Sequence, residues 1–318
     1  MNSLSFKSLQ NKFLANAALL IGGFTVAWSV HAMDIDFKPV APGVFVYVGD
    51  TEGRTYENEA LNANIGLVVT SEGAVLVDSG ATLKTGQKIA EAAKRVTSQP
   101  IRWVINTGGQ DHRWLGNGYF KSQGAEIIAH ANAQSDMKAR GQEQLRANAP
   151  VLKEKQDGTE PVYPARWLAG DDNVLEIGGV RMQFVHRSGG HTPGDMMVYL
   201  PETGVVFTGD VVYVDRILGL HPVSKTKNWV ASFEALQALK PRIVVPGHGN
   251  VSDLAQAERD TGSLLKALRE HMGKAVDAGT DISAAVKSFD TKPFKHLKHV
   301  DVWMPQLANL TYLEMEQE

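Results

Sequence analysis

The chain has 318 residues, of which 43% are hydrophobic and 21% charged, with a formal net charge of −3. These values are typical of a globular protein with a large core, and they exclude disordered, collagenous and coiled-coil chains. No polybasic run occurs, so we expect no nucleic-acid partner. Cysteine is absent, which excludes disulfides, thiolate nucleophiles and sulfur-ligated metals, so any metal ion must be held by His, Asp or Glu.

The first 32 residues have the pattern of a secretory signal. Lys7 and Lys12 precede an apolar stretch over residues 13–30, and the segment ends in the small residue Ala32. The alternative is an uncleaved membrane anchor, because this stretch is at the lower limit for crossing a bilayer. Cleavage would leave a chain of net charge −5 with no stable membrane association, in the periplasm or secreted. The absence of cysteine fits a bacterial periplasm.

The mature chain shows two kinds of apolar pattern: short runs rich in Val, Ile and Leu predict strands, and helical spacing predicts helices. The expected strands cover residues 44–48, 65–69, 74–77, 101–105, 125–129, 173–177, 180–186, 196–200, 205–208 and 243–245. The expected helices cover residues 82–96, a segment from 131, residues 228–239 and most of the chain after 252. Residues 141–172 contain three prolines and are expected to form a long surface excursion.

Three polar clusters follow predicted strands, where loops on a rigid scaffold often carry function. They are Asp111-His112, residues 188–195 (SGGHTPGD), and the pair formed by residues 208–210 (TGD) and 246–249 (PGHG). A single histidine at a strand end is often a structural residue, but the joint pattern points to metal binding. Imidazoles and carboxylates without a thiol match the ligands of zinc, manganese and iron(II). The candidate metal ligands in these clusters are three imidazoles, His112, His191 and His248, and one or two of the carboxylates.

These motifs, in this order, resemble those of the metallo-β-lactamase superfamily over roughly residues 40–250. The matching segments are residues 64–80 (ending in VDSG), 191–195 (HTPGD), 207–210 (FTGD) and 246–249 (PGHG). The resemblance implies an α+β fold, a four-layer αββα sandwich of two mixed β-sheets with helices outside and a metal site at one edge. Members of the superfamily hydrolyse lactams, thioesters, lactones and phosphate esters, and some oxidise sulfur compounds. The motifs do not choose among these substrates.

The first motif of the family, His-x-His-x-Asp-His, is incomplete in this chain, which reads NTGGQDHRWLGN over residues 106–117. If Asp111-His112 matches the family's Asp-His, Thr107 and Gly109 stand where two histidines belong. If the flanking residues are matched without gaps, Gly108 and Gln110 replace the histidines, His112 replaces the Asp, and Arg113 replaces the last His. Only His112 is a plausible ligand in both alignments, so the site that depends on His-x-His is not expected to form.

The resemblance therefore implies one zinc ion rather than two, with manganese or iron as alternatives. Its ligands would be His112, Asp210 and His248, joined by Asp111 in the first alignment. By resemblance, His191 belongs to the lost first metal. It could contact the same ion or carry protons.

Five residues are given roles around this ion. Asp210 or Asp111 is expected to accept the proton of a water molecule, and Arg113 to hold an anionic group of a small-molecule substrate. His221 is a second substrate-binding candidate, with a plain loop position as the alternative. Asp78, by resemblance, orients the loop that carries His112.

The predicted organisation is a signal peptide (1–32), a metallo-β-lactamase-like domain (33–260) and a C-terminal helical extension (261–318). The extension is expected to pack on the sandwich, to cover the pocket entrance, or to form a homodimer face. The predicted function is an exported metal-dependent hydrolase. The alternative is a non-catalytic or ligand-binding periplasmic protein that keeps the fold without the dinuclear centre.

Overall fold

The computed structural model describes residues 33–318. The predicted signal peptide lies outside these residues, so it stays a prediction. Within the described part of the chain, no helix combines the length and the apolar character that a membrane crossing needs.

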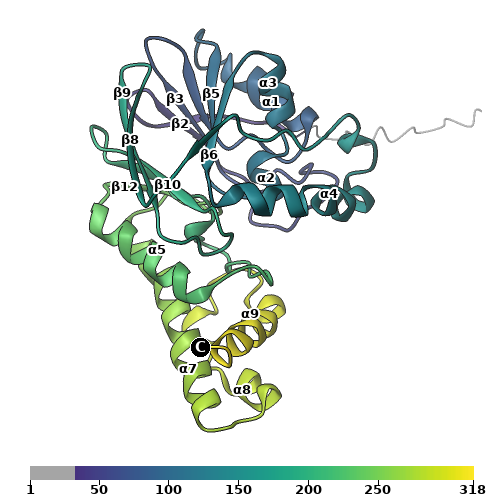
Figure 1. Cartoon of the computed structure of the whole chain (residues 1–318), viewed down its shortest axis with the longest axis vertical. Helices are drawn as coiled ribbons and strands as arrows, with labels where there is room; N and C mark the ends of the chain where they lie inside the picture. Colours follow the sequence, from purple (N-terminus) through teal and green to yellow (C-terminus); the bar gives the residue numbers. More distant parts are fainter. Residues whose placement is uncertain (1–32) are drawn as a thin grey trace, which may run out of the picture. The chain divides into compact units, whose positions relative to one another are not determined.

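The strands form two mixed sheets (Figure 1). The seven-stranded sheet has the order β1-β2-β3-β4-β5-β6-β7, antiparallel from β1 to β4 and parallel from β4 to β7. Its strands are β1 (Lys38–Ala41), β2 (Val44–Tyr47), β3 (Ile65–Val69), β4 (Ala74–Val77), β5 (Ile101–Asn106), β6 (Glu126–His130) and β7 (Arg166–Leu168). The five-stranded sheet has the order β12-β11-β10-β9-β8, in which only β11 and β12 are parallel. Its strands are β8 (Asp172–Ile177), β9 (Val180–His186), β10 (Met196–Leu200), β11 (Val205–Phe207) and β12 (Ile243–Val245).

Helices cover the outer faces of both sheets. Helix α1 (Leu83–Ala93) begins after Thr82, whose hydroxyl accepts the backbone N–H of Thr85 at 3.0 Å and caps the helix. It packs on the seven-stranded sheet beside α3 (Asn117–Ser122). Helix α5 (Thr226–Leu239) covers the five-stranded sheet and buries three large side chains there. These side chains are Trp229, Phe233 and Leu236.

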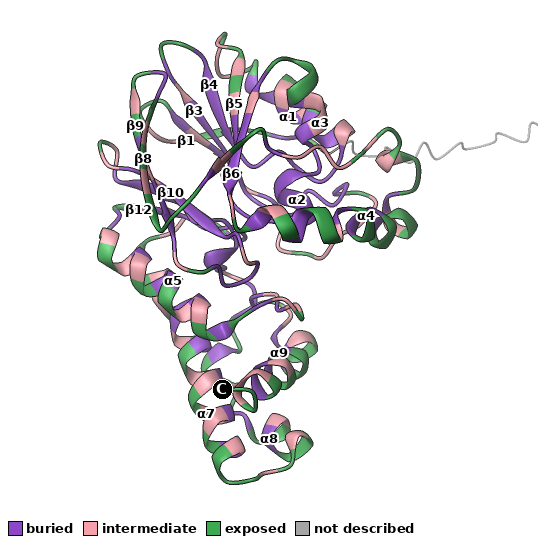
Figure 2. Cartoon of the chain, viewed as in Figure 1, coloured by how far each residue is buried: buried purple, intermediate pink, exposed green. Residues whose placement is uncertain are grey.

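Alternate residues along the central strands fill different layers, because successive side chains point to opposite faces of a sheet. Val75 and Val77 of β4 pack between the two sheets, whereas Leu76 packs outward in the cluster that includes α1. Val198 of β10 likewise faces the other sheet, and Met197 faces α5 and the C-terminal helices. Figure 2 shows the strands as largely buried. The predicted sandwich of two mixed sheets with helices outside is confirmed.

The C-terminal region is helical, as predicted. Its elements are α6 (Leu254–Ala257), the π-helical turn η3 (Glu258–Gly262), α7 (Ser263–Asp277), α8 (Ile282–Ser288), η4 (Lys292–Phe294) and α9 (Val300–Met315). Leu268 of α7 and Leu307 of α9 belong to the same buried cluster as Val206 of β11. The C-terminal helices therefore share one hydrophobic core with α5 and the outer face of the five-stranded sheet.

The expected surface excursion over residues 141–172 is wrong in its first part. Helix α4 (Ala133–Leu152) runs through residue 152, followed by the short helix η1 (Lys153–Gln156). Pro150 lies in the last turn of α4, too close to its end to break it. Two polar residues of this part are buried: Gln144 Nε2 donates to the carbonyl of Gly109 at 2.8 Å, and Asn148 Nδ2 donates to Asp111 at 2.6 Å.

Candidate metal centre

His112 lies in the short helix α2 (Asp111–Trp114), after the carboxyl end of β5. The loop that leads into this helix is held by Asp78, whose Oδ1 accepts the backbone N–H of Thr107 at 2.8 Å. Asp78 Oδ2 accepts a second bond, from Arg113 Nη1 at 2.9 Å. Asp78 has a φ of 69°, a backbone conformation that is energetically costly for a residue with a Cβ. These contacts confirm that Asp78 orients the loop that carries His112.

Asp210 is the central residue of the one-turn helix η2 (Gly209–Val211), directly after β11. Gly209 has a φ of 51°, and a Cβ at this position would collide with the side chain of Thr107. Glycine therefore lets the loop that carries Asp210 approach the loop after β5.

His248 follows β12, and its loop is fixed from the other sheet. Asn64, just before β3, donates its side-chain amide to the carbonyls of Pro246 and Gly249, both at 2.8 Å. Asn64 precedes a strand of the seven-stranded sheet, and His248 follows a strand of the five-stranded sheet. These bonds therefore tie the two sheets together and fix the position of the histidine.

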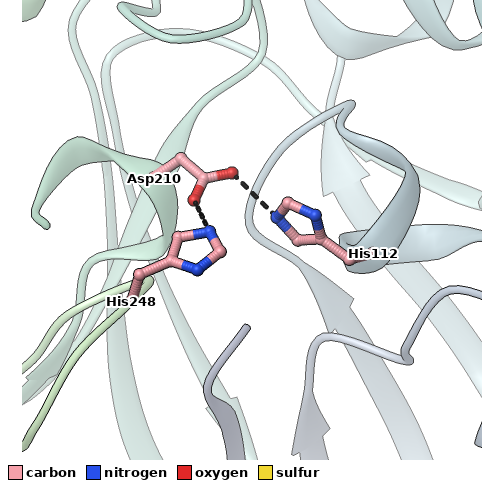
Figure 3. Close-up of side chains that lie close together, drawn as sticks. All are labelled: His112, Asp210 and His248. Carbon is pink, nitrogen blue, oxygen red and sulfur yellow. Dashed lines mark hydrogen bonds and ion pairs between the residues drawn. The ribbon is translucent and has the colours of Figure 1, made fainter. Parts of the chain in front are cut away.

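The side chains of His112, Asp210 and His248 converge (Figure 3). Asp210 Oδ2 lies 3.3 Å from His112 Nε2, and Asp210 Oδ1 lies 3.2 Å from His248 Nε2. All three candidate ligand atoms lie within 4.8 Å of one another, and all three residues are buried. Three loops, from two sheets, thus place two imidazoles and one carboxylate around a common point.

Hydrogen bonds fix which imidazole nitrogen faces the carboxylate. His248 Nδ1 lies 2.9 Å from the carbonyl oxygen of Asn62, which can only accept, so Nδ1 donates and Nε2 directs a lone pair toward Asp210. His191 Nδ1 donates in the same way to the carbonyl of Gly219 at 3.0 Å. Its buried Nε2 has no hydrogen-bond partner and lies 3.8 Å from Asp210 Oδ2. Lone pairs that face a carboxylate are stabilised by a cation between them, and metal-binding histidines typically donate their other nitrogen to a carbonyl.

The protonation states favour metal binding as well. Burial lowers the pKa of His248 well below 6.5 and the pKa of His191 to about 3, so both imidazoles are neutral at physiological pH. Burial alone would raise the pKa of Asp210, but the Arg113 guanidinium and the neighbouring His112 and His191 together outweigh it and hold this pKa well below 3.8. Neutral imidazoles and an ionised carboxylate are the forms that bind zinc, manganese or iron(II).

Arg113 does not contact the cavity, which corrects the expectation that it holds a substrate anion. The residue is 1% exposed and pairs with two carboxylates. Its Nη2 donates to Asp210 Oδ1 at 2.6 Å, and its Nη1 donates to Asp78 Oδ2 at 2.9 Å. These two buried partners satisfy its charge, so its role is to orient Asp210.

Asp111 does not join the group of three candidate ligands, which corrects its expected roles as a ligand and a proton acceptor. Its Oδ2 accepts Arg54 Nε at 2.8 Å and Asn148 Nδ2 at 2.6 Å, and its Oδ1 accepts its neighbour's backbone N–H at 2.9 Å. Both oxygens are therefore engaged. This geometry agrees with the alignment without gaps, in which His112 and not Asp111 provides the ligand.

The positions of the two absent histidines in this alignment are Gly108 and Gln110. A Cβ at Gly108 would lie 2.7 Å from Asp195 Oδ1 and 3.2 Å from Thr192 Oγ1, so neighbouring side chains fill that space. Gln110 lines the cavity, and its buried Oε1 has no hydrogen-bond partner.

A cavity of about 170 Å³ lies against His112 and His248. His221 is in its wall, with its ring centroid 5.0 Å from that of His191. Helix α9 contributes further wall residues, which are Trp303, Gln306 and Leu307. The C-terminal helices thus reach the pocket and also pack on the sandwich, while the homodimer face stays a prediction.

Two arginines of the cavity wall, Arg54 and Arg216, were not anticipated. Arg54 lies in the loop before β3 and pairs with Asp111. The sequence contains a signal that could have identified Arg216 as a candidate site residue. It is one of two charged residues in the apolar stretch over residues 211–220 (VVYVDRILGL), which follows Asp210. A charge in such a buried segment needs a partner or a ligand.

Comparison with known protein families matches residues 58–248 to the model described as "Metallo-beta-lactamase superfamily". This span covers more than half of the chain and contains His112, Asp210 and His248. Helix α9 lies beyond it.

Similarity to individual proteins is moderate. Human (Homo sapiens) "Acyl-coenzyme A thioesterase MBLAC2" is 26% identical over 247 residues, which cover 70% of this chain and 82% of that protein. "Metallo-beta-lactamase type 2" of Bacillus cereus is 28% identical over 208 residues, which cover 64% of this chain and 73% of that protein. The structure of a double mutant of the sec-alkyl sulfatase PisA1 matches with a TM-score of 0.70 at 15% identity, over 87% of this chain and 50% of that one. This last likeness concerns the fold alone.

Proposed function

Because the chain belongs to the metallo-beta-lactamase superfamily, we propose that it is a hydrolase with one zinc ion held by His112, Asp210 and His248. The observation that carries this proposal is that their ligand atoms all lie within 4.8 Å of one another in a buried group. Three such ligands leave one position of a tetrahedral ion open to water. Manganese and iron(II) accept the same ligands, and metal analysis of the purified protein distinguishes them from zinc.

One ion is favoured over two by the residues at the absent first site. Gly108 offers no side chain, and the space beside its Cα is taken by Asp195 and Thr192. Gln110 is a poor ligand beside imidazole. His191 is then the only histidine that the resemblance leaves for a first ion, and one imidazole does not hold a zinc ion.

The chain's own residues supply the remaining requirements of hydrolysis. A zinc ion at this site would acidify a water molecule and polarise a carbonyl or ester oxygen of the substrate. His191 Nε2 has no protein partner and its ring lines the cavity, so it is placed to accept a hydrogen bond from the attacking water and orient it. With a pKa of about 3, this imidazole is a weak proton acceptor, so we assign it an orienting role.

The proposed substrates are small esters, thioesters or lactams. The names of the relatives support this range, since one is a thioesterase and another a metallo-beta-lactamase. The cavity volume of about 170 Å³ accommodates the reacting group and a short substituent, while a larger substrate would extend outside.

We further propose that the protein is exported to the periplasm or secreted, and binds no nucleic acid. The apolar segment over residues 13–30 and the net charge of the chain support this. Expression of the full gene, followed by mass spectrometry of the purified protein, tests it: a mature N-terminus at Met33 is expected. An intact chain recovered with membranes would favour the anchor instead.

Metal analysis combined with a substrate panel tests the hydrolase. The purified protein should contain about one zinc per chain and hydrolyse at least one of a chromogenic lactam, a thioester and a carboxylic ester. His248→Gln should lose both metal and activity. His296→Gln is the control, because His296 pairs with Asp260 away from the site and glutamine keeps a donor there.

The alternative function, a ligand-binding protein without catalysis, has one observation in its favour. Arg113 already provides a cation to Asp210 through two hydrogen bonds. A chain that takes up no zinc, manganese or iron and is inert toward the whole panel would support this alternative and refute the hydrolase.

A further inference from the structure

A buried threonine in the π-helical turn η3 forms hydrogen bonds outside its own helix. Thr261 Oγ1 accepts the backbone N–H of Tyr213 at 3.0 Å and donates to the backbone carbonyl of Tyr213 at 2.5 Å. A threonine inside a helix usually points to solvent or donates to a carbonyl of the preceding turn, as Thr311 of α9 does to Leu307 at 2.8 Å. π-Helical turns within α-helices often occur at functional sites. The hydroxyl of Thr261 therefore connects the C-terminal helices to the segment that follows η2.

This hydroxyl pairs with both backbone polar groups of Tyr213. In the part of the chain that the structure describes, neither group has another hydrogen-bond partner. The flanking residues instead bond to the loop after β12. The carbonyl of Val212 accepts the N–H of Gly247 at 2.9 Å, and the N–H of Val214 donates to the carbonyl of the next residue in that loop, His248, at 3.0 Å. Because an unpaired polar group of the backbone is costly in a protein interior, the hydroxyl fixes the main chain at Tyr213.

The ring of Tyr213 fixes the plane of the His248 imidazole. The two rings are stacked, with centroids 4.7 Å apart and an angle of 20° between their planes, and both side chains are buried. The bond from His248 Nδ1 to the carbonyl of Asn62 then sets the direction of Nε2 within this plane. The ring of His112 meets the imidazole at an angle of 84°, with centroids 5.1 Å apart. A displacement of Tyr213 would therefore change the direction in which His248 Nε2 faces Asp210.

The supporting threonine lies outside the family match. Residues 58–248 match the model of the family, and Thr261 follows them in the C-terminal region. Thr261 does not line the cavity, so it acts on the site only through Tyr213. Removing a contact that orients a metal-binding histidine typically lowers the affinity for the metal by about 10- to 100-fold. The contacts from Thr261 to Tyr213 and from Tyr213 to His248 thus give the C-terminal region an influence on the candidate metal site.

We propose that Thr261 is a positioning residue for the candidate metal ligand His248, and that it acts through the ring of Tyr213. The π-helical turn thereby sets the affinity of the site for its metal ion, although the three candidate ligands lie within the family match. The effect on affinity rests on the proposed hydrolase function, which supplies the metal. The orientation of the imidazole does not, because the contacts that fix it are formed by the chain alone.

The metal affinity of hydroxyl variants tests the proposal. The dissociation constant for zinc would be measured by competition with a chromophoric chelator, and the coordination geometry by the visible spectrum of the cobalt(II)-substituted protein. Thr261→Val keeps the shape but removes the hydroxyl, so it should raise the dissociation constant at least tenfold and change the cobalt spectrum. Thr261→Ser, which restores the hydroxyl, should stay within about threefold of the wild type and keep the spectrum. The matched control is Thr311→Val, because it removes a buried hydroxyl that bonds within α9, and it should leave both measurements unchanged.

A variant of Tyr213 shows whether the threonine acts through this ring. Tyr213→Leu keeps both backbone bonds but removes the stacked ring, so it should itself raise the zinc dissociation constant at least tenfold. In this background, Thr261→Val should add less than about twofold, because the ring through which it acts is gone. An equal effect of Thr261→Val in both backgrounds would overturn the proposal, as would a wild-type constant and cobalt spectrum in Thr261→Val. If Thr261→Val does not fold, Tyr213→Leu decides alone, and a wild-type constant in that variant overturns the proposal.

Failure of the hydrolase assignment gives a separate result. A wild type that binds none of zinc, cobalt(II), manganese and iron(II) would refute the hydrolase, and the metal-free protein then decides the inference by NMR. The signal of the His248 Nδ1–H, which donates to the Asn62 carbonyl, should shift or exchange faster with water in Thr261→Val and stay unchanged in Thr311→Val. An unchanged signal in Thr261→Val would overturn the inference. A zinc-loaded, active enzyme whose metal affinity ignores Thr261→Val would overturn it as well and leave the hydrolase standing.

Discussion

Arg113 and Asp210 form a buried ion pair with two hydrogen bonds: Nη2 donates to Oδ1 at 2.6 Å, and Nε donates to Oδ2 at 3.2 Å. The pair holds the carboxylate of Asp210 in one orientation, with each oxygen also facing one imidazole nitrogen, from His112 or His248. A residue that the sequence suggested for substrate binding is thus part of the support of the metal site.

Removal of this arginine should destabilise the fold strongly. Arg113→Ala leaves Asp210 and Asp78 as buried carboxylates without their main partner, so the free energy of unfolding should fall by about 3–5 kcal/mol. Urea denaturation measures this change. The control is Arg166→Ala on the surface, which should cost less than about 0.5 kcal/mol. A loss below about 1 kcal/mol for Arg113→Ala would contradict the structural role of the pair.

Reinstating the absent histidines should not create a second metal site. In the double variant Gly108→His and Gln110→His, the Cβ at position 108 would lie 2.7 Å from Asp195 Oδ1, so overpacking should lower stability by about 1–3 kcal/mol. Metal content should stay near one ion per chain. Gly53→Ala, where a Cβ meets nothing within 4 Å, is the control for an added side chain. Two ions per chain in a stable double variant would show that the space can be reopened.

The fold was predictable because its signals are local. The apolar residues of β4 alternate between layers, as Val75 and Leu76 do, and the strand pattern shows directly in the sequence. The three candidate ligands were predicted from the family resemblance, which rests on short motifs that each follow a strand. Such motifs carry their own turn residues, so their geometry depends little on distant parts of the chain.

The misassigned and missed residues depend on partners far away in sequence. Arg113 and Asp210 are 97 positions apart, and nothing near either residue indicates the pair. Asn148 was placed in a solvated loop because it is polar, although it is buried against Asp111, 37 positions away. A polar residue read alone predicts exposure, and only the assembled fold supplies the partner that allows its burial.

His191 should be needed for turnover but not for metal binding. Its Nε2 lies 3.8 Å from Asp210 Oδ2 and outside the group of three candidate ligands. His191→Gln should therefore keep about one zinc per chain while kcat falls by roughly 10- to 100-fold, because the attacking water loses an oriented acceptor. Metal analysis and steady-state kinetics on the same sample measure both. Loss of the ion in His191→Gln would show instead that His191 is a ligand.

Asp195 should make stability depend on pH between about 4 and 7. Burial raises the pKa of this carboxyl from 3.8 to about 7, and hydrogen bonds from Thr192 only partly oppose it. At this site the folded state therefore binds more protons than the unfolded state in this range, so the contribution of Asp195 to stability is largest below about pH 4 and is lost as the pH rises to about 7. Asp195→Asn removes the ionisation, and the variant should gain up to about 4 kcal/mol over the wild type between these limits. Urea denaturation at a series of pH values on chelator-treated protein measures the difference. Asp36→Asn, at an exposed position, is the control, and a constant difference between Asp195→Asn and wild type across this range would contradict the raised pKa.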